Sequence, residues 1–289
     1  MSNEKGRVNM KSEFKIMGKL SSNVTSLWHS HGRSDYSTDV MMPCTEKSMA
    51  VLPWVVRSVR KYLRHPIEGI YIVAPRSEAI EKFCKTEGLE YIHEVDLVGF
   101  SKSVVHHYYE GEDRSGHMYQ QLLKMFSDHI GKAKYIFIHD SDALMIRPRR
   151  FEYGGEIALE YFETLDPQYF DHFDKLFPGY SHIEASFICH EMYLEKSLLA
   201  DLRAEIERLH PGKSWWETLI ALMDTSQLCS FSEYETIGQY IVHNKIAGYS
   251  KSIEHYLNKG LTLGNWIKRP YKRLLYPSRY KTVSFHSYQ

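Results

Sequence analysis

Residues 135–148, YIFIHDSDALMIRP, decide how this chain folds. The first five, YIFIH, form a short apolar run rich in β-branched and aromatic side chains, which predicts a buried central strand. The run stops at Asp140-Ser141-Asp142, so two carboxylates follow where the strand leaves the sheet. Side chains at positions i and i+2 of an extended segment point the same way, so both carboxylates can reach one cation. A metal ion held there could also hold a diphosphate.

A bare D-x-D pair has an ordinary explanation as well. The chain has 12 Asp residues, so chance alone supplies about 0.5 such pairs, and the motif by itself is unspecific. Asp and Ser are also common turn residues after a strand. Here a buried strand delivers the pair, and an amphipathic helix precedes that strand. This context favours a metal or nucleotide site over a simple turn.

Strands and helices alternate in the first half of the sequence. The hydrophobic pattern predicts strands over residues 40–44, 69–74, 90–93 and 135–139. It predicts helices over residues 49–63, 78–85 and 116–130, with a long polar loop over residues 95–115 that we expect to be functional. Such alternation predicts an α/β fold, with a doubly wound, mostly parallel sheet and helices on both faces.

The second half is less regular. The pattern predicts strands over 156–162 and 183–189, helices over 193–209, 215–223 and 232–245, and an aromatic loop over 166–180. We expect one continuous domain. Residues 1–39 are a polar extension, partly disordered or wrapping the domain, and residues 40–150 and 151–289 are its two halves.

Composition excludes several classes of protein. The formal net charge is zero, so no global field favours nucleic acid as a partner. The four cysteines show no C-x-x-C spacing and fit reduced thiols. No G-x-G-x-x-G follows the first strand and no G-x-x-x-x-G-K occurs, which disfavours dinucleotide oxidoreductases and P-loop enzymes. Without an apolar leader or a membrane-length run, a cytoplasmic protein is expected.

The helix over residues 232–245 opens with Ser232-Glu233-Tyr234-Glu235. The spacing S-x-x-E predicts a capping box, which explains Ser232 and Glu235 structurally. Glu233 has no such role. It lies in the first turn, where the helix dipole keeps a carboxylate ionised and ready to accept a proton. A solvated surface position is the alternative interpretation of Glu233.

Several motifs together resemble glycosyltransferases of the GT-A fold. They are a first strand ending near Thr45, the helix sequence YQQLLK over residues 119–124, and the D-S-D strand end before Arg147-Pro148. The combination is considerably more specific than D-x-D alone. The resemblance implies a GT-A-like α/β fold, with a nucleotide-sugar-binding half before residue 150 and a less regular acceptor-binding half after it.

A narrower resemblance adds Trp215-Trp216 and the segment FSEYETIGQY over residues 231–240. With these motifs the chain resembles a bacterial family of GT-A-like proteins associated with surface-polysaccharide synthesis, of lipopolysaccharide or capsule. The likeness covers roughly residues 40–249 and is patchy between motifs. It implies transfer of a sugar from a nucleotide sugar to a glycan or lipid-linked acceptor.

The GT-A resemblance implies a metal site. In such enzymes the D-x-D pair lies between the donor's ribose and a divalent cation on the diphosphate. Asp142 would be the direct ligand, and Asp140 would contact the ribose, or the metal through water. Oxygen ligands and phosphate suit Mg²⁺ or Mn²⁺, which neutralises the leaving diphosphate. Several such families add a late histidine, and His286 is the candidate here.

The resemblance also implies where the donor nucleotide lies, which is over the loop after the first strand. Pro43, Thr45 and Arg76 are therefore candidate donor contacts, and Gln121 of the helix motif is a fourth. An inverting enzyme needs one general base for the acceptor hydroxyl. Glu233 is the first candidate, followed by Asp224 and then Glu184. A retaining mechanism is equally compatible with the sequence.

Other functions fit parts of the sequence. A sugar nucleotidyltransferase shares the parallel sheet and the carboxylate-bound metal, but normally has a Gly-rich basic loop where this chain has Cys44-Thr45-Glu46. A haloacid-dehalogenase-like phosphatase carries its D-x-D on the first strand, followed by Gly-Thr. A non-catalytic nucleotide-sugar binder or membrane-associated scaffold is the alternative from a different class.

The tail is basic. From residue 255 onward there are seven Lys or Arg and no acidic residue, namely Lys259, Lys268, Arg269, Lys272, Arg273, Arg279 and Lys281. Aromatic and aliphatic residues are interleaved with them, as in segments that lie on anionic membranes. Residues 259–281 are therefore a candidate contact with the inner face of the cytoplasmic membrane. A solvated face, or one that binds the donor diphosphate, is the alternative.

Overall fold

A five-stranded sheet forms the centre of the protein, in a computed structural model that describes residues 32–161, 167–253, 256–257, 263–268, 277 and 280–285. The strand order is β10–β6–β1–β2–β3. These strands are β1 (Thr38–Pro43), β2 (Ile67–Ala74), β3 (Glu90–His93), β6 (Tyr135–His139) and β10 (Glu191–Glu195). Four of them run parallel, and β10 pairs antiparallel with β6. The predicted mostly parallel α/β sheet is confirmed.

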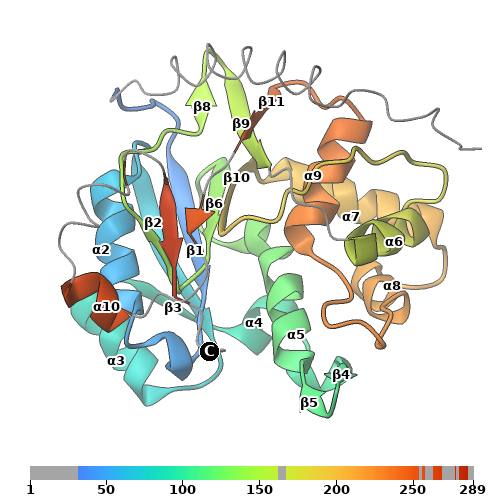
Figure 1. Cartoon of the computed structure of the whole chain (residues 1–289), viewed down its shortest axis with the longest axis horizontal. Coiled ribbons are helices and arrows are strands. Elements are labelled where there is room, and N and C mark those ends of the chain that lie inside the picture. Colours follow the sequence, from blue (N-terminus) through green and yellow to red (C-terminus); the bar gives the residue numbers. More distant parts are fainter. Residues whose placement is uncertain are drawn as a thin grey trace, which may run out of the picture.

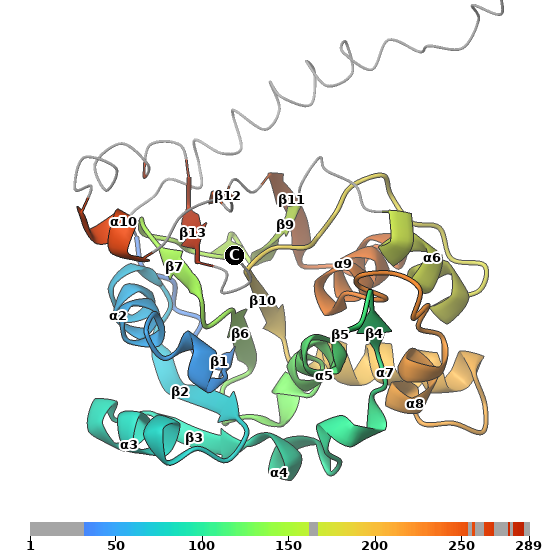
Figure 2. The same cartoon turned by 60° about the horizontal axis from the view of Figure 1, so that its bottom comes forward.

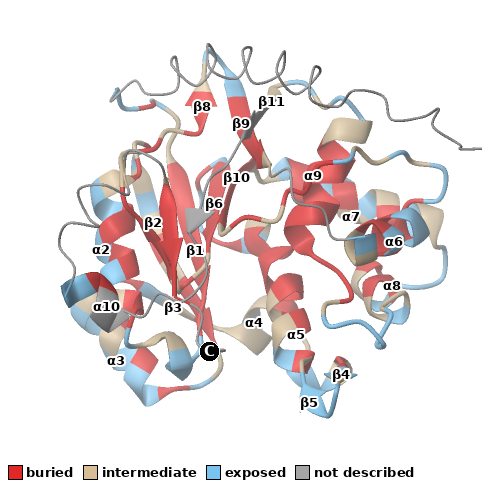
Figure 3. Ribbon diagram, in the orientation of Figure 1, coloured by how far each residue is buried: buried red, intermediate tan, exposed pale blue. Residues whose placement is uncertain are grey.

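Helices cover both faces of this sheet (Figure 1). One face carries α2 (Leu52–Tyr62) and α3 (Glu78–Glu87); the other carries α5 (Ser115–Lys124), α7 (Ser197–Leu209) and α9 (Glu233–His243). Alternate strand residues serve the two cores: Val40 packs on the α2 side and Met41 on the α5 side. The sheet is therefore buried between two helical layers (Figure 3).

The sheet is doubly wound because the chain leaves β1 in one direction and returns on its other side. β2 and β3 lie on one side of β1, and β6 lies on the other. The strand order therefore reverses between β1 and β6. In open parallel sheets, the crevice beyond the carboxyl ends at such a point is where ligands bind.

Three details of the first half differ from expectation. β1 begins at Thr38, and buried Asp39 accepts hydrogen bonds from the amide of Ala133 at 2.8 Å and from Lys196 at 2.7 Å, so the sheet starts inside the expected extension. The helix expected to reach residue 130 ends at Lys124. The expected loop 95–115 contains short elements: α4 (Glu94–Val98), η2 (Lys102–Val104), β4 (Tyr108–Tyr109) and β5 (Glu112–Asp113).

Two expectations for the second half are wrong. Residues expected as an aromatic loop form helix α6 (Pro167–Leu176), because Phe170, Phe173 and Leu176 fall on one buried face. Residues 183–189 form no strand, and the strand follows as β10. Side chains of α9 take the place of a strand partner there: Gln239 donates to the carbonyls of Ile183 and Ala185 at 3.1 and 2.9 Å.

Smaller elements complete the described chain. They are η1 (Glu46–Ser48), η3 (Ser127–His129), β7 (Ala143–Met145), β8 (Glu152–Tyr153), β9 (Glu156–Tyr161), α8 (Trp215–Ala221), β11 (Tyr249–Ile253), β12 (Tyr256–Leu257), α10 (Leu263–Lys268) and β13 (Thr282–Ser284). None of the helices in the described ranges combines the length and hydropathy that a membrane span needs.

The late strand β13 runs beside the D-S-D segment. It pairs antiparallel with β7, and the amide of Phe285 donates to the carbonyl of Asp142 at 3.0 Å. Buried charges hold this strand: Lys281 pairs with Glu160 at 2.8 Å, and Thr282 donates to Glu191 at 2.9 Å. The end of the described chain is thus fixed next to the candidate site.

Candidate functional site

Three potential metal ligands meet at the carboxyl end of β6. One ligand atom from each of Asp140, Asp142 and His190 lies within 4.8 Å of the others, and all three residues are partly exposed. This edge of the sheet faces the viewer in Figure 2. Two carboxylates and an imidazole form a donor set that suits a divalent cation such as Mn²⁺. The predicted carboxylate pair thus lies where one cation can reach it.

His190 is a site residue that the sequence interpretation missed. It precedes β10, whose antiparallel pairing places Glu191 opposite His139, so His190 falls next to Asp140. The amide of Asp140 donates to the carbonyl of His190 at 2.8 Å, and the His190 Nδ1 lies 3.1 Å from Asp140 Oδ2. His190 lies just before the apolar residues of β10, which could have indicated its position. The strand was predicted over residues 183–189, before His190, whereas it follows His190 in the structure.

The ends of β1 and β2 contribute the candidate donor contacts. Pro43 ends β1, which is parallel to β6, and Thr45 follows on the same edge. Cys44 between them is buried, and its thiol donates to the carbonyl of Thr45 at 3.3 Å. Burial raises the pKa of the Cys44 thiol to about 12, so it is no nucleophile. Arg76 follows β2 and is exposed.

Lys124, at the end of α5, bridges two carboxylates. Its Nζ lies 2.6 Å from Asp140 Oδ1 and 2.7 Å from Glu233 Oε1, and the Lys124 side chain is only 5% exposed. It also lies over the Tyr234 ring, 4.3 Å from the centroid. The sequence interpretation included Lys124 in the helix motif but gave it no role.

Neighbouring charges and burial have opposite effects on the pKa values of Asp140, Lys124 and Glu233, and the charges dominate at Asp140 and Lys124. Burial opposes ionisation of Asp140, yet Lys124 and His190 hold the Asp140 pKa well below its usual range. Burial likewise opposes the charge of Lys124, but Asp140 and Glu233 raise the Lys124 pKa above its ordinary value. At Glu233 burial wins over Lys124, and the Glu233 pKa is raised.

Glu233 has no exposed surface, so the solvated-surface interpretation is wrong. The amide of Gln121, oriented with its nitrogen toward α9, donates to both oxygens of the Glu233 carboxylate. Its oxygen accepts from His117 Nε2 at 3.3 Å. Gln121 therefore contacts Glu233 in this structure, and its expected role as a donor contact stays a prediction.

Glu235 does not complete the predicted capping box. Ser232 caps the helix by accepting from the amide of Glu235 at 3.3 Å, but the Glu235 carboxylate turns inward. It accepts from Ser186 Oγ at 2.8 Å, from the amide of Phe187 at 3.1 Å and from Gln239 at 2.7 Å. Glu235 thus holds the irregular segment before His190.

Other candidate residues lie elsewhere or outside the description. Asp224 is exposed, and its carboxylate accepts from Ser226, which lowers the Asp224 pKa. Glu184 is also exposed. His286 lies outside the described residues. Of the seven basic tail residues, the structure describes two: Lys268 is exposed, and Lys281 is buried against Glu160.

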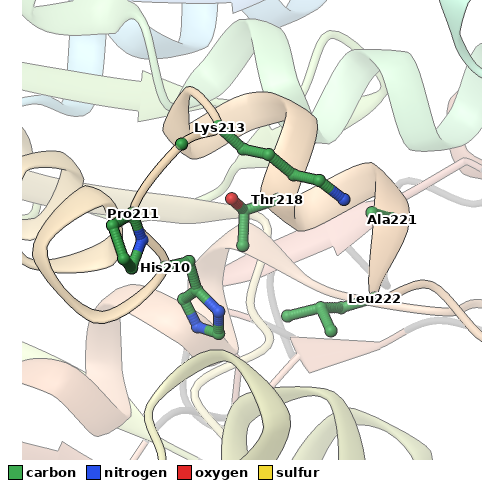
Figure 4. A pocket seen from close by; sticks show the side chains of 7 residues that line it. His210, Pro211, Lys213, Thr218, Ala221 and Leu222 are labelled. Atoms are coloured by element: carbon green, nitrogen blue, oxygen red, sulfur yellow. The ribbon is translucent and has the colours of Figure 1, made fainter.

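A separate pocket of about 320 Å³ lies between the loop that follows α7 and helix α8 (Figure 4). Its lining residues are His210, Pro211, Gly212, Lys213, Thr218, Ala221 and Leu222. None of them belongs to the group around Asp140. Thr218 Oγ1 donates to the carbonyl of Ser214 and the His210 Nε2 lies 2.8 Å from the carbonyl of Leu176, so both serve the local fold.

Similarity to known proteins is found in structure and not in sequence. No protein-family model matches the sequence, and no curated protein sequence matches it. Among solved structures, the apo crystal structure of mouse xyloside xylosyltransferase 1 is similar at 12% sequence identity, over 87% of this chain and 98% of that chain. The TM-score is 0.45.

Proposed function

We propose that this protein is a metal-dependent glycosyltransferase, which moves a sugar from a nucleotide sugar to a glycan or lipid-linked acceptor in bacterial surface-polysaccharide synthesis. One observation carries the proposal: Asp140, Asp142 and His190 converge at the carboxyl edge, where the strand order reverses. The resemblance of the D-S-D, QQLLK and SEYE motifs to GT-A enzymes supports the same function.

The donor set fits a divalent cation. Asp140, Asp142 and His190 would hold Mn²⁺ or Mg²⁺, and the imidazole favours Mn²⁺. His286 is a further candidate ligand. When bound, the cation supplies positive charge for the leaving diphosphate. Pro43, Thr45 and Arg76 are proposed to contact the donor nucleotide, since they lie at or just after the carboxyl ends of β1 and β2.

Glu233 is the proposed general base, with Asp224 as the alternative. Its raised pKa makes the carboxylate a better proton acceptor. Because Glu233 has no exposed surface, an acceptor hydroxyl would have to displace Gln121 or Lys124 to reach it. The exposed Asp224 has no such barrier, but its carboxylate already binds Ser226.

We further propose that the protein works in the cytoplasm at an anionic membrane surface, through residues 259–281. The basic charge of this tail supports the contact. In the described part of the tail, Ile267 and Lys268 are exposed on α10, whereas Trp266 and Lys281 are buried and would not take part. Sedimentation with anionic vesicles at low salt tests this location; no sedimentation overturns it.

A thermal-shift panel tests the function. Nucleoside diphosphate sugars of several bases are added with and without Mn²⁺, and a donor at 100-fold above its dissociation constant should stabilise the protein by about 2.7 kcal/mol. We expect one donor class to act only with Mn²⁺. Turnover of that donor separates an enzyme from a non-catalytic binder or scaffold. Release of pyrophosphate from a nucleoside triphosphate and a sugar phosphate would instead identify a nucleotidyltransferase.

A further inference from the structure

A chain of four polar groups runs through the site in the order Glu233, Lys124, Asp140, His190. The successive distances between their nitrogen and oxygen atoms are 2.7, 2.6 and 3.1 Å. The four residues come from α9, α5, the end of β6 and the segment before β10. These four polar groups therefore join four separate parts of the fold at the candidate metal site.

Lys124 holds one particular oxygen of Asp140. Its ammonium contacts Oδ1, and the Tyr234 hydroxyl approaches the same oxygen at 3.4 Å, whereas His190 contacts Oδ2. The three N–H donors of an ammonium have three acceptors here: Asp140, Glu233 and the Tyr234 ring. At 5% exposure, Lys124 has little freedom to turn elsewhere.

We propose that Lys124 is a positioning residue of the metal site, which fixes Oδ1 of Asp140 so that Oδ2 faces His190 and the cation. This inference rests on the proposed function, because it takes Asp140, Asp142 and His190 as the metal ligands. The competing explanation is that Lys124 serves only as the counterion that lets Glu233 be buried.

Charge counting agrees with this role. Asp140, Asp142, Glu233 and Lys124 carry a formal charge of −2 together. A divalent cation neutralises that charge. Without Lys124, the three carboxylates would carry a formal charge of −3, which a divalent cation would not neutralise. Lys124 thus adjusts the site to a divalent ion while leaving Oδ2 of Asp140 to the metal.

The variant that separates the two explanations is K124M/E233Q. It removes the ammonium and one carboxylate together, so the formal charge of the site stays at −2 and no buried carboxylate loses its partner. The amide that Glu233→Gln introduces can still hydrogen-bond to Gln121. What is lost is the hold on Asp140, together with the contact of the ammonium with the Tyr234 ring. The matched control is K196M/D39N, which removes both charges of the buried ion pair of Lys196 with Asp39 (2.7 Å) at the other end of β1.

The measurement is direct binding of Mn²⁺ alone, by titration calorimetry and by the electron paramagnetic resonance signal of free Mn²⁺. Loss of a residue that orients a metal ligand costs about 10–100-fold in affinity. We expect that loss in K124M/E233Q, with a melting temperature near that of the wild type, and unchanged affinity in K196M/D39N.

The outcomes are distinct. If the wild type and K124M/E233Q bind Mn²⁺ equally well, Lys124 is only a counterion and this proposal is overturned, while the proposed function stands. If the wild type binds no Mn²⁺, the metal site of the proposed function fails as well. Should the double variant not fold, Lys124→Arg decides: it keeps the charge, so a counterion role predicts full affinity and a positioning role predicts weakened binding.

Discussion

Asp140 is contacted from three elements at once, and that is why its role could be only half predicted. The sequence placed Asp140 and Asp142 at a strand end, because an apolar run followed by D-S-D needs nothing but local pattern. Lys124 and His190 lie 16 residues before and 50 residues after Asp140. No periodicity links residues so far apart, so only the pairing of strands and helices reveals their contact.

Replacing Asp142 with Asn should abolish Mn²⁺-dependent donor binding and leave the fold intact. The side chain is partly exposed at a strand end and is one of the three grouped ligands, so we expect its charge to serve the cation. Thermal shifts with donor and Mn²⁺ measure the effect. Asp201→Asn, an exposed carboxylate on α7, is the control and should bind donor normally. Full Mn²⁺-dependent binding by Asp142→Asn would show that the site is assigned to the wrong residue.

Glu235→Gln should destabilise the protein by about 1–3 kcal/mol, because an amide cannot accept from both Phe187 and Gln239 without facing a donor with its own nitrogen. Urea unfolding measures the change. Glu217→Gln is the matched control: Ser214 and Glu217 form a complete capping box on α8, where Gln replaces Glu well. Equal, small losses in both variants would mean that Glu235 is an ordinary cap.

Among the elements, α9 carries most of what sequence patterns could not show. Its helical spacing was predictable, but its polar residues Glu233, Glu235 and Gln239 are all buried, which an amphipathic pattern would place at the surface. Gln239 and Glu235 are buried because they hydrogen-bond to the backbone of residues 183–187 in place of a strand partner. Glu233 is buried because it pairs with Lys124. The prediction of a strand over residues 183–189 was wrong for the same reason, because backbone groups of this segment hydrogen-bond to the Gln239 side chain of α9.

Gly238→Ala should destabilise the protein, although alanine favours an exposed helix interior by about 1 kcal/mol over glycine. A Cβ at Gly238 would overlap the Phe187 ring, and such overpacking costs about 1–3 kcal/mol or more. Gly116→Ala on α5 is the control, since its Cβ would meet only the Lys102 side chain, at 3.7 Å. Chemical unfolding of both variants checks this; stabilisation by both would show that α9 packs more loosely.

At the scale of the whole molecule, buried neutral histidines should make the fold sensitive to acid. His65 accepts from the amide of Phe151 at 2.9 Å through Nε2, so its Nδ1–H donates to the carbonyl of Tyr36 at 3.0 Å. Burial lowers the His65 pKa from 6.5 to about 4. The unfolded chain therefore binds a proton below pH 6.5 that the folded chain binds only near pH 4. Stability from this residue is complete above 6.5 and is lost as pH falls through that window.

His65→Gln should remove this acid sensitivity in part. Glutamine can donate to the carbonyl of Tyr36 and accept from the amide of Phe151 without titrating. Between pH 6.5 and pH 4, the free energy of unfolding of His65→Gln should therefore fall by about 3 kcal/mol less than that of the wild type. Unfolding curves at several pH values measure it. His106→Gln, at an exposed position, is the control. Parallel pH profiles for His65→Gln and the wild type would contradict the prediction.

The pairing of β1 with β6 also has a consequence for folding kinetics. β1 pairs with β2 about 30 residues later in the chain, but with β6 only after about 100 residues. Contacts of long sequence separation form slowly, because the intervening chain must first be ordered. The half-sheet β1–β2–β3 should thus assemble before β6 joins it. In refolding experiments, Mn²⁺ binding would then return later than helical circular dichroism, since the ligands on β6 reach the edge of β1 only at that last step.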